Sequence, residues 1–237
     1  MKKNIVITGG NGRFGSVLKK INKKEFFLFP TKKQLNILKL NSIKNYLKIK
    51  KTKIVIHLAG LSRPMNIHDK NINKSIDLNI IGTANIVKAC SLIGIKLVYF
   101  STHYVYPCQK GNYSENSPLL PINNYAWSKL GGEAAVQMYK NSLILRICMT
   151  EKPFIHRSAF ANVKSNFIFH QDVAKILPKL INKKGIINVG GKKQTIYNFA
   201  KNNNSEVKKV YLKRKSKIKF PKNPSINIKK LKRLISV

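Results

Sequence analysis

The chain has 237 residues, which is enough to bury one full hydrophobic core but leaves little room for two independent domains. Hydrophobic residues make up 43% of the sequence, which excludes wholesale disorder, and no apolar run approaches the ~20 residues that a membrane span needs. The 46 Lys and Arg against 8 Asp and Glu give a net charge of +38, but the basic residues are spread along the whole chain instead of forming one patch, so we expect no specific nucleic-acid partner.

Short apolar runs alternate with amphipathic stretches. The expected strands cover residues 4–8, 26–29, 53–58, 96–100, 143–147 and 186–189. The expected helices cover residues 13–22, 42–50, 76–92, 125–139 and 171–181. This alternation is typical of a parallel sheet with helices on both faces, so we predict an α/β fold with a doubly wound parallel Rossmann sheet.

The pattern weakens after Ile147. A polar stretch and a very basic tail follow, and residues 226–235 suit a short amphipathic helix. We therefore expect a Rossmann dinucleotide-binding domain over residues 1–150 and a small C-terminal substrate-binding lobe over 151–237. Part of this lobe, about 171–204, is expected to return to the Rossmann domain, and the lobe is expected to cover the carboxyl edge of the sheet, where ligands bind in such folds.

The cysteines indicate the compartment. Cys90, Cys108 and Cys148 are odd in number and lack the spacing of metal ligands, so we expect free thiols, no metal site and a cytoplasmic protein. The basic start Met1-Lys2-Lys3 precedes an apolar run that is too short for a signal peptide and ends in glycines. That run is interpreted as the first strand.

A glycine-rich turn follows the first expected strand and opens the first expected helix. It reads Gly10-x-Gly12-x-x-Gly15 or, with a different start, Gly9-x-x-Gly12-x-x-Gly15. Without side chains the backbone can approach a pyrophosphate, and the helix N-terminus offers free N–H groups to its charge. This context predicts a dinucleotide site.

Tyr125 and Lys129 lie four residues apart in an expected helix. Such residues share one helix face, so the ammonium can hold the phenol ready to give or take a proton. A Ser101-Thr102 pair ends an apolar run ahead of them. With the glycine turn, these residues indicate carbonyl and alcohol redox chemistry beside a bound dinucleotide.

Four segments in chain order carry a family resemblance. They are Gly9-x-x-Gly12-x-x-Gly15, His57-Leu58-Ala59-Gly60, Ser101-Thr102 and Tyr125-x-x-x-Lys129. On these residues the chain resembles the extended short-chain dehydrogenase/reductase family. Residues 101–106 and 124–133 look most like dTDP-4-dehydrorhamnose reductases. The resemblance is specific from residue 5 to about 147 and fainter at 172–174, 188–191 and 224–227.

The resemblance implies which residues do the chemistry. Tyr125 would protonate the carbonyl oxygen as hydride arrives, Lys129 would favour the phenolate and bond the nicotinamide ribose, and Thr102 would hydrogen-bond the substrate oxygen. The cofactor-binding residues would be Gly9, Gly12, Arg13, Phe14, Gly15, Ala59, Gly60, Asn79, Tyr125 and Lys129. For Asn79, an amide on the helix surface is an equal alternative.

Two other polar residues on strands keep simpler interpretations. His57 is expected to be a packed core residue and not a base. Arg146 could pair with substrate phosphate or cap the sheet edge, and both alternatives stay open.

The chain also departs from the family pattern. His103 stands where the reductases usually carry Asp, and His103-Tyr104 replaces the Asp-Glu pair of 4,6-dehydratases, so dehydration is disfavoured. The lobe is short for the family. Either its substrate site is minimal, or a partner subunit completes it, or the enzyme is degenerate.

The end of the second expected strand bears on the cofactor. Residues 29–33 contain no acid that could accept the ribose hydroxyls of NAD, but they include Lys32 and Lys33. With Arg13 in the glycine turn, these cations favour NADPH over NADH.

The resemblance therefore implies an NAD(P)H-dependent reductase of a nucleotide-linked 4-keto-6-deoxy sugar, acting in surface polysaccharide synthesis. The alternatives are a nucleotide-sugar epimerase with tightly bound NAD and a non-catalytic NADP(H)-binding regulatory protein. A homodimer formed through the helices near Ile76 and Tyr125 is expected from the same resemblance.

Overall fold

The protein is built around one parallel six-stranded sheet. The computed structural model describes residues 4–22, 26–212 and 221–236. In spatial order the strands are β2 (Phe27–Leu28), β1 (Ile5–Thr8), β3 (Ile54–His57), β4 (Lys96–Thr102), β5 (Ser142–Ile147) and β10 (Gly185–Val189). Every neighbouring pair is parallel. The order reverses at β1, so the crevice at the carboxyl ends of β1 and β3 is a topological switch point.

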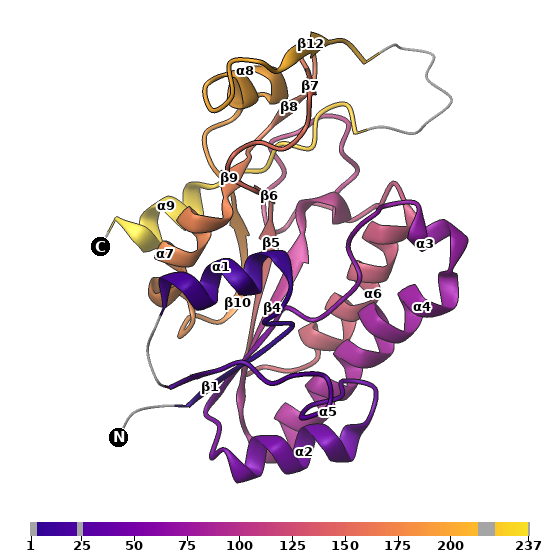
Figure 1. Cartoon of the computed structure of the whole chain (residues 1–237), viewed down its shortest axis with the longest axis vertical. Helices are drawn as coiled ribbons and strands as arrows, with labels where there is room; N and C mark the ends of the chain where they lie inside the picture. Colours follow the sequence, from indigo (N-terminus) through magenta and orange to yellow (C-terminus); the bar gives the residue numbers. More distant parts are fainter. Residues whose placement is uncertain (1–3, 23–25, 213–220, 237) are drawn as a thin grey trace.

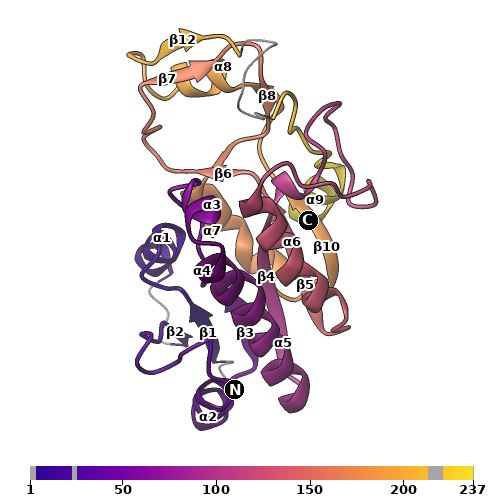
Figure 2. The ribbon, with the colours of Figure 1, turned by 90° about the vertical axis from the view of Figure 1, so that its right-hand side faces the viewer.

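Helices cover both faces of this sheet (Figures 1 and 2). On one face lie α1 (Arg13–Ile21), α7 (His170–Leu180) and α9 (Lys229–Ile235), and on the other lie α2 (Leu40–Ile49), α5 (Gly82–Ile93) and α6 (Asn124–Gln137). Each face has its own apolar core, one containing Leu18 and Leu177 and the other containing Leu47 and Ile86. The predicted doubly wound α/β fold is confirmed.

The helix expected at 76–92 is longer and interrupted. It runs through α4 (Ile72–Ile76), a π-helical turn η1 (Asp77–Ile81) and α5, and it ends at Gly94, whose φ of +73° suits glycine. By length and composition Ile72–Ile93 could cross a membrane, which is weak evidence because a core helix of a soluble protein passes the same test. Here the segment packs against α2 and α6.

A small lobe stands over the carboxyl ends of the central strands (Figure 1). Its short strand pairs are β6 (Met149–Thr150) with β9 (Ile168–Phe169), β7 (Ser158–Phe160) with β12 (Lys208–Val210), and β8 (Lys164–Ser165) with β11 (Gln194–Thr195). With α8 (Ile196–Lys201) the lobe encloses a separate apolar cluster that includes Phe154, Phe169 and Phe199. Of the expected returning segment 171–204, α7 and β10 pack with the central sheet, whereas β11 and α8 belong to the lobe.

Two further short elements complete the description. They are α3 (Ile67–Lys70), after β3, and the 3₁₀ turn η2 (His103–Val105), after β4. Most expected elements begin and end within a few residues of the observed ones, and the expected tail helix is α9. The very basic stretch 213–220 lies outside the described residues.

Candidate active site

A cavity of about 1030 Å³ lies between the carboxyl ends of the central strands and the lobe. Strand ends, the glycine turn, the start of α6 and lobe residues from Phe154 to Ile196 all contribute to its wall. The predicted site residues that line it are Gly9, Gly12, Arg13, Phe14, Gly15, Gly60, Thr102, Tyr125 and Lys129. Ala59 and Asn79 are not among the lining residues. The structure thus brings the predicted catalytic residues and the glycine turn to one cavity.

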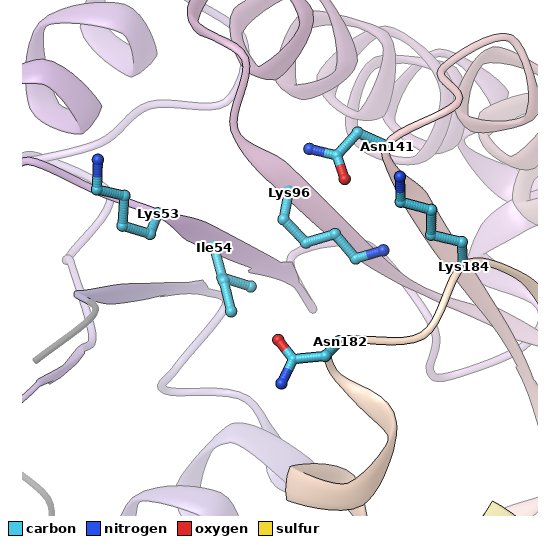
Figure 3. A pocket seen from close by; sticks show the side chains of 6 residues that line it. All are labelled: Lys53, Ile54, Lys96, Asn141, Asn182 and Lys184. Carbon is cyan, nitrogen blue, oxygen red and sulfur yellow. The ribbon is translucent and has the colours of Figure 1, made fainter.

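A smaller cavity of about 270 Å³ lies where β3 and β4 begin, at the opposite edge of the sheet (Figure 3). It is lined by Lys53, Ile54, Lys96, Asn141, Asn182 and Lys184. Burial and the neighbouring charge of Lys184 lower the pKa of Lys96 to about 8. No predicted site residue lies there.

The glycine turn packs too closely for side chains. Gly9 has a φ of +72°, and a Cβ on it would lie 2.6 Å from the Ala59 nitrogen. A Cβ on Gly15 would lie 2.6 Å from the Gly9 carbonyl oxygen. Because no side chain caps the start of α1 at Gly12, the first N–H groups of this helix can bind an anion. The turn therefore fits a dinucleotide pyrophosphate.

Thr102 and Tyr125 meet where β4 ends and α6 begins. The Asn123 side chain caps α6 by accepting a hydrogen bond from the Ala126 N–H at 2.9 Å, which fixes the first helical turn. Burial raises the pKa of Tyr125, against the opposing effects of a hydrogen bond with the Thr102 side chain and the charges of Arg13 and Arg63. The phenol therefore keeps its proton near neutral pH and can act as an acid.

Lys129 lies one turn further along α6 and is only 8% exposed. Burial lowers its pKa to about 7, although Glu133 acts in the opposite direction. The sequence predicted that the Lys129 cation would favour the phenolate of Tyr125. In the structure the charges of Arg13 and Arg63 lower the pKa of Tyr125, and the effect of Lys129 on the phenol stays a prediction.

His57 is a packed core residue, as expected. Its Nδ1 lies 2.7 Å from the Thr8 hydroxyl and its Nε2 lies 3.1 Å from the Thr83 hydroxyl. Burial, and then the charge of Lys129, lower its pKa to about 3, so the imidazole is neutral.

Asn79 lies in the π-helical turn and is 1% exposed, so it is not a helix-surface amide. It accepts a hydrogen bond from the Leu61 N–H at 2.6 Å and donates to the Leu61 carbonyl at 2.9 Å and to the Ser128 hydroxyl at 2.8 Å. Ser128 in turn donates to the Tyr125 carbonyl at 2.8 Å. Asn79 therefore joins the loop after β3 to the helix turn that carries Tyr125, and its contact with a cofactor stays a prediction.

Arg146 fits neither expected alternative. It is 2% exposed and pairs with the fully buried carboxylate of Glu133 at 2.6 Å. Glu133 also accepts a hydrogen bond from the Ser101 hydroxyl at 2.5 Å. Arg146 and Glu133 therefore form an internal ion pair that ties α6 to β5 and β4.

Several residues around the cavity were not predicted from the sequence. Arg63 follows β3, and Glu151 follows β6 and binds both Arg63 and Arg13. The ring of His68, on α3, lies 5.2 Å from that of Tyr125. Arg63 had no local signal in so basic a chain, whereas Glu151 is one of only 8 acidic residues and could have been singled out.

His103 is buried beside Thr102. Its Nδ1 lies 3.1 Å from the Ile147 carbonyl oxygen, and burial lowers its pKa to about 4. A neutral ring thus stands where the resemblance leads one to expect a carboxylate. Among residues 4–22, 26–212 and 221–236, no cluster of three or more His, Cys, Asp or Glu could hold a metal ion.

Comparison with known proteins places the chain in a family. The chain is 29% identical over 152 residues to the methionine adenosyltransferase 2 subunit beta of Xenopus laevis, covering 60% of this chain and 45% of the relative. It is 31% identical over 205 residues to a dTDP-D-glucose 4,6-dehydratase of Dictyostelium discoideum, covering 79% and 41%. The chain thus spans less than half the length of these curated relatives.

Solved structures share the fold. A dTDP-4-dehydrorhamnose reductase of Bacillus anthracis in complex with NADP superposes with a TM-score of 0.85 at 24% identity, covering 98% of this chain and 92% of the other. The Bordetella bronchiseptica enzyme WbmG in complex with NAD and UDP gives 0.76 at 18% identity, covering 100% and 88%. The family described as RmlD substrate binding domain matches residues 1–151, well over half of the sequence, and the chain belongs to this family.

Proposed function

We propose that the protein is an NAD(P)H-dependent reductase of a nucleotide-linked 4-keto-6-deoxy sugar. The observation that carries the proposal is that Thr102, Tyr125 and Lys129 line the same cavity as the glycine turn. A nicotinamide cofactor would supply the hydride when bound. The residues of the chain would then have to hold the cofactor, orient the substrate carbonyl and deliver one proton.

The catalytic residues divide this work. Tyr125 donates its hydroxyl proton to the carbonyl oxygen, and its raised pKa keeps that proton available. Thr102, hydrogen-bonded to Tyr125, orients the same oxygen. Lys129 bonds the nicotinamide ribose, and its pKa of about 7 lets it exchange a proton near neutral pH. The turn from Gly9 to Gly15 and Gly60 line the cavity and hold the rest of the cofactor. Ala59 and Asn79, which are not among the lining residues, stay predicted cofactor-binding residues.

The finer assignments of cofactor, domains, compartment and assembly are proposals that rest on the sequence and its family resemblance. NADPH is favoured over NADH because the segment that follows β2 contains Lys32 and Lys33 and no acid. The relatives crystallised with NADP, and with NAD and UDP, support a nicotinamide cofactor and a nucleotide-linked substrate. We place residues 151–237 as a substrate lobe whose segments α7 and β10 return to the Rossmann domain. We also propose that the protein is a cytoplasmic homodimer and that its product enters surface polysaccharide synthesis.

Mass spectrometry of reaction mixtures tests this function. Purified protein is incubated with a panel of nucleotide keto-sugars and either NADH or NADPH. The proposal predicts loss of coenzyme absorbance together with a sugar-nucleotide mass gain of one hydride plus one proton. Unchanged masses across the panel contradict it.

A second candidate is a non-catalytic NADP(H)-binding regulatory protein. It is favoured by the Xenopus laevis relative, which is named as a subunit of an adenosyltransferase and not as an oxidoreductase. Dinucleotide binding without turnover on any keto-sugar would support this candidate.

An epimerase is the third candidate and uses the same Tyr125 and Lys129. Purified protein that carries bound NAD and interconverts sugars without added coenzyme would support it.

A further inference from the structure

Three charged side chains meet at the partly exposed rim of the large cavity. Arg13 Nη1 and Arg63 Nη1 each lie 3.1 Å from Glu151 Oε1, and Arg63 Nη1 also lies 3.3 Å from Glu151 Oε2. Arg13 opens α1, Arg63 follows β3 and Glu151 follows β6, and all three line the cavity. One carboxylate therefore joins three separate segments of the cavity wall.

The contacts among Arg13, Arg63 and Glu151 also span the topological switch point between β1 and β3. Arg13 Nη2 donates a hydrogen bond to the Ser62 hydroxyl at 2.8 Å, so this side chain reaches from the glycine turn to the loop after β3. Phosphate groups that bind the N-terminus of α1 have to enter beside this side chain, since Arg13 is the first residue of that helix.

Glu151 is ionised in this arrangement. Burial alone would raise the pKa of its carboxyl, but the charge of Arg63, a hydrogen bond from its own backbone N–H, and the charges of Arg13 and His170 hold the pKa below its ordinary value. Its side chain is 18% exposed, whereas those of Arg13 and Arg63 are 42% and 38% exposed. The two guanidinium groups are thus accessible to a ligand, but both are already paired with the Glu151 carboxylate.

We propose that Glu151 is an internal counter-ion that competes with ligand phosphate for Arg13 and Arg63. A guanidinium binds carboxylate and phosphate with the same forked geometry, so the phosphates of an incoming dinucleotide can take over both arginines. The inference rests on the proposed function only in that the ligand is a dinucleotide. This competition between Glu151 and ligand phosphate weakens cofactor binding and makes cofactor release easier.

Isothermal titration with NADP⁺ tests the competition without any turnover. Glu151→Gln removes the negative charge and keeps the size of the side chain. The dissociation constant of this variant for NADP⁺ should be about three- to tenfold lower than that of the wild type. Glu206→Gln is the matched control, because Glu206 is an exposed acid of the lobe that does not line the cavity. This control should bind NADP⁺ like the wild type.

A double-mutant cycle identifies the arginines as the groups in competition. In the Arg13→Gln/Arg63→Gln background, NADP⁺ binding should be weaker, and the added Glu151→Gln change should give no further gain. Unchanged or weaker binding by Glu151→Gln alone, or an undiminished gain without the arginines, overturns the role of Glu151 and leaves the proposed function intact. Folded wild-type protein that binds no dinucleotide overturns the proposed function, and this inference with it.

Discussion

The Lys129 ammonium nitrogen lies 4.2 Å from the centre of the Tyr99 ring, and the Tyr99 hydroxyl donates a hydrogen bond to the Lys129 carbonyl oxygen at 3.0 Å. The face of the ring partly replaces the water that the ammonium has lost. Burial nevertheless lowers the pKa of Lys129 to about 7. The amine of the proposed catalytic pair is therefore held in place by one aromatic residue and is poised between its charged and neutral forms.

Lys129 should make the stability of the protein depend on pH. Its pKa is about 7 in the folded state, below the ordinary lysine value of 10.5 that applies to the unfolded chain. Between these values the unfolded chain binds more protons, so the free energy of unfolding should rise as the pH increases from 7 towards 10. Urea denaturation should show that the wild type gains stability over this range relative to Lys129→Met.

The control for this pH dependence is Lys88 of α5. It carries the same type of side chain as Lys129 but is exposed to solvent. A Lys88→Met variant should follow the wild type at every pH. If Lys129→Met also runs parallel to the wild type, Lys129 keeps an ordinary pKa in the folded protein and the description of its environment is wrong.

Substituting only one partner of the internal ion pair between Glu133 and Arg146 should lower the free energy of unfolding strongly. Arg146→Met leaves the fully buried Glu133 carboxylate without its cation, so the free energy of unfolding should fall by about 3–5 kcal/mol. The double variant Arg146→Met/Glu133→Leu removes both charges and should recover much of this loss. Urea denaturation measures both, and a double variant as unstable as the single one would contradict the pairing.

Gly15 should tolerate no side chain. In Gly15→Ala the new Cβ would lie 2.6 Å from the Gly9 carbonyl oxygen and 2.7 Å from backbone atoms of Gly10, so the turn has to shift. The free energy of unfolding should fall by about 1–3 kcal/mol, and NADP⁺ affinity should fall with it. Ser16→Ala, at the exposed neighbouring position, should change neither, and a Gly15→Ala variant that matches it would show that the turn is looser than described.

The proposed homodimer can be tested on α4 and α6. Ile72, Ile76 and Trp127 are 54%, 39% and 50% exposed, and these two helices pack side by side. Trp127→Ser should convert a wild-type dimer into a monomer, measured by light scattering after size-exclusion chromatography. A wild type that is monomeric at micromolar concentration would rule out this dimer.

The features that the sequence could predict are those with a local signature. The glycine turn has its own residue pattern, the buried strands are continuous apolar runs, and Tyr125 and Lys129 are neighbours on one helix. Apolar patterning therefore predicted the sheet and most helices. The family resemblance carried by the matched segments predicted that Tyr125, Lys129 and the glycine turn share one site, and they line one cavity. The π-helical turn around Asn79 lies in a sequence that reads as an ordinary helix, so its presence could not be foreseen.

The remaining features depend on contacts between distant segments. Glu151 meets Arg13 across 138 positions of sequence and Arg63 across 88, and no local pattern connects them. The charge state of Lys129 depends on burial beneath Tyr99 and beside Glu133, which spacing along α6 does not reveal. The sequence left Arg146 open between a partner of substrate phosphate and a cap of the sheet edge, because its buried partner Glu133 lies on another element.

The Tyr125→Phe variant tests the central claim most directly, once a substrate has been identified. Removing one hydroxyl takes away the proton donor but leaves the glycine turn and the cavity intact, so turnover should be abolished while the dissociation constant for NADP⁺ stays close to that of the wild type. Near-normal turnover in this variant would contradict the account.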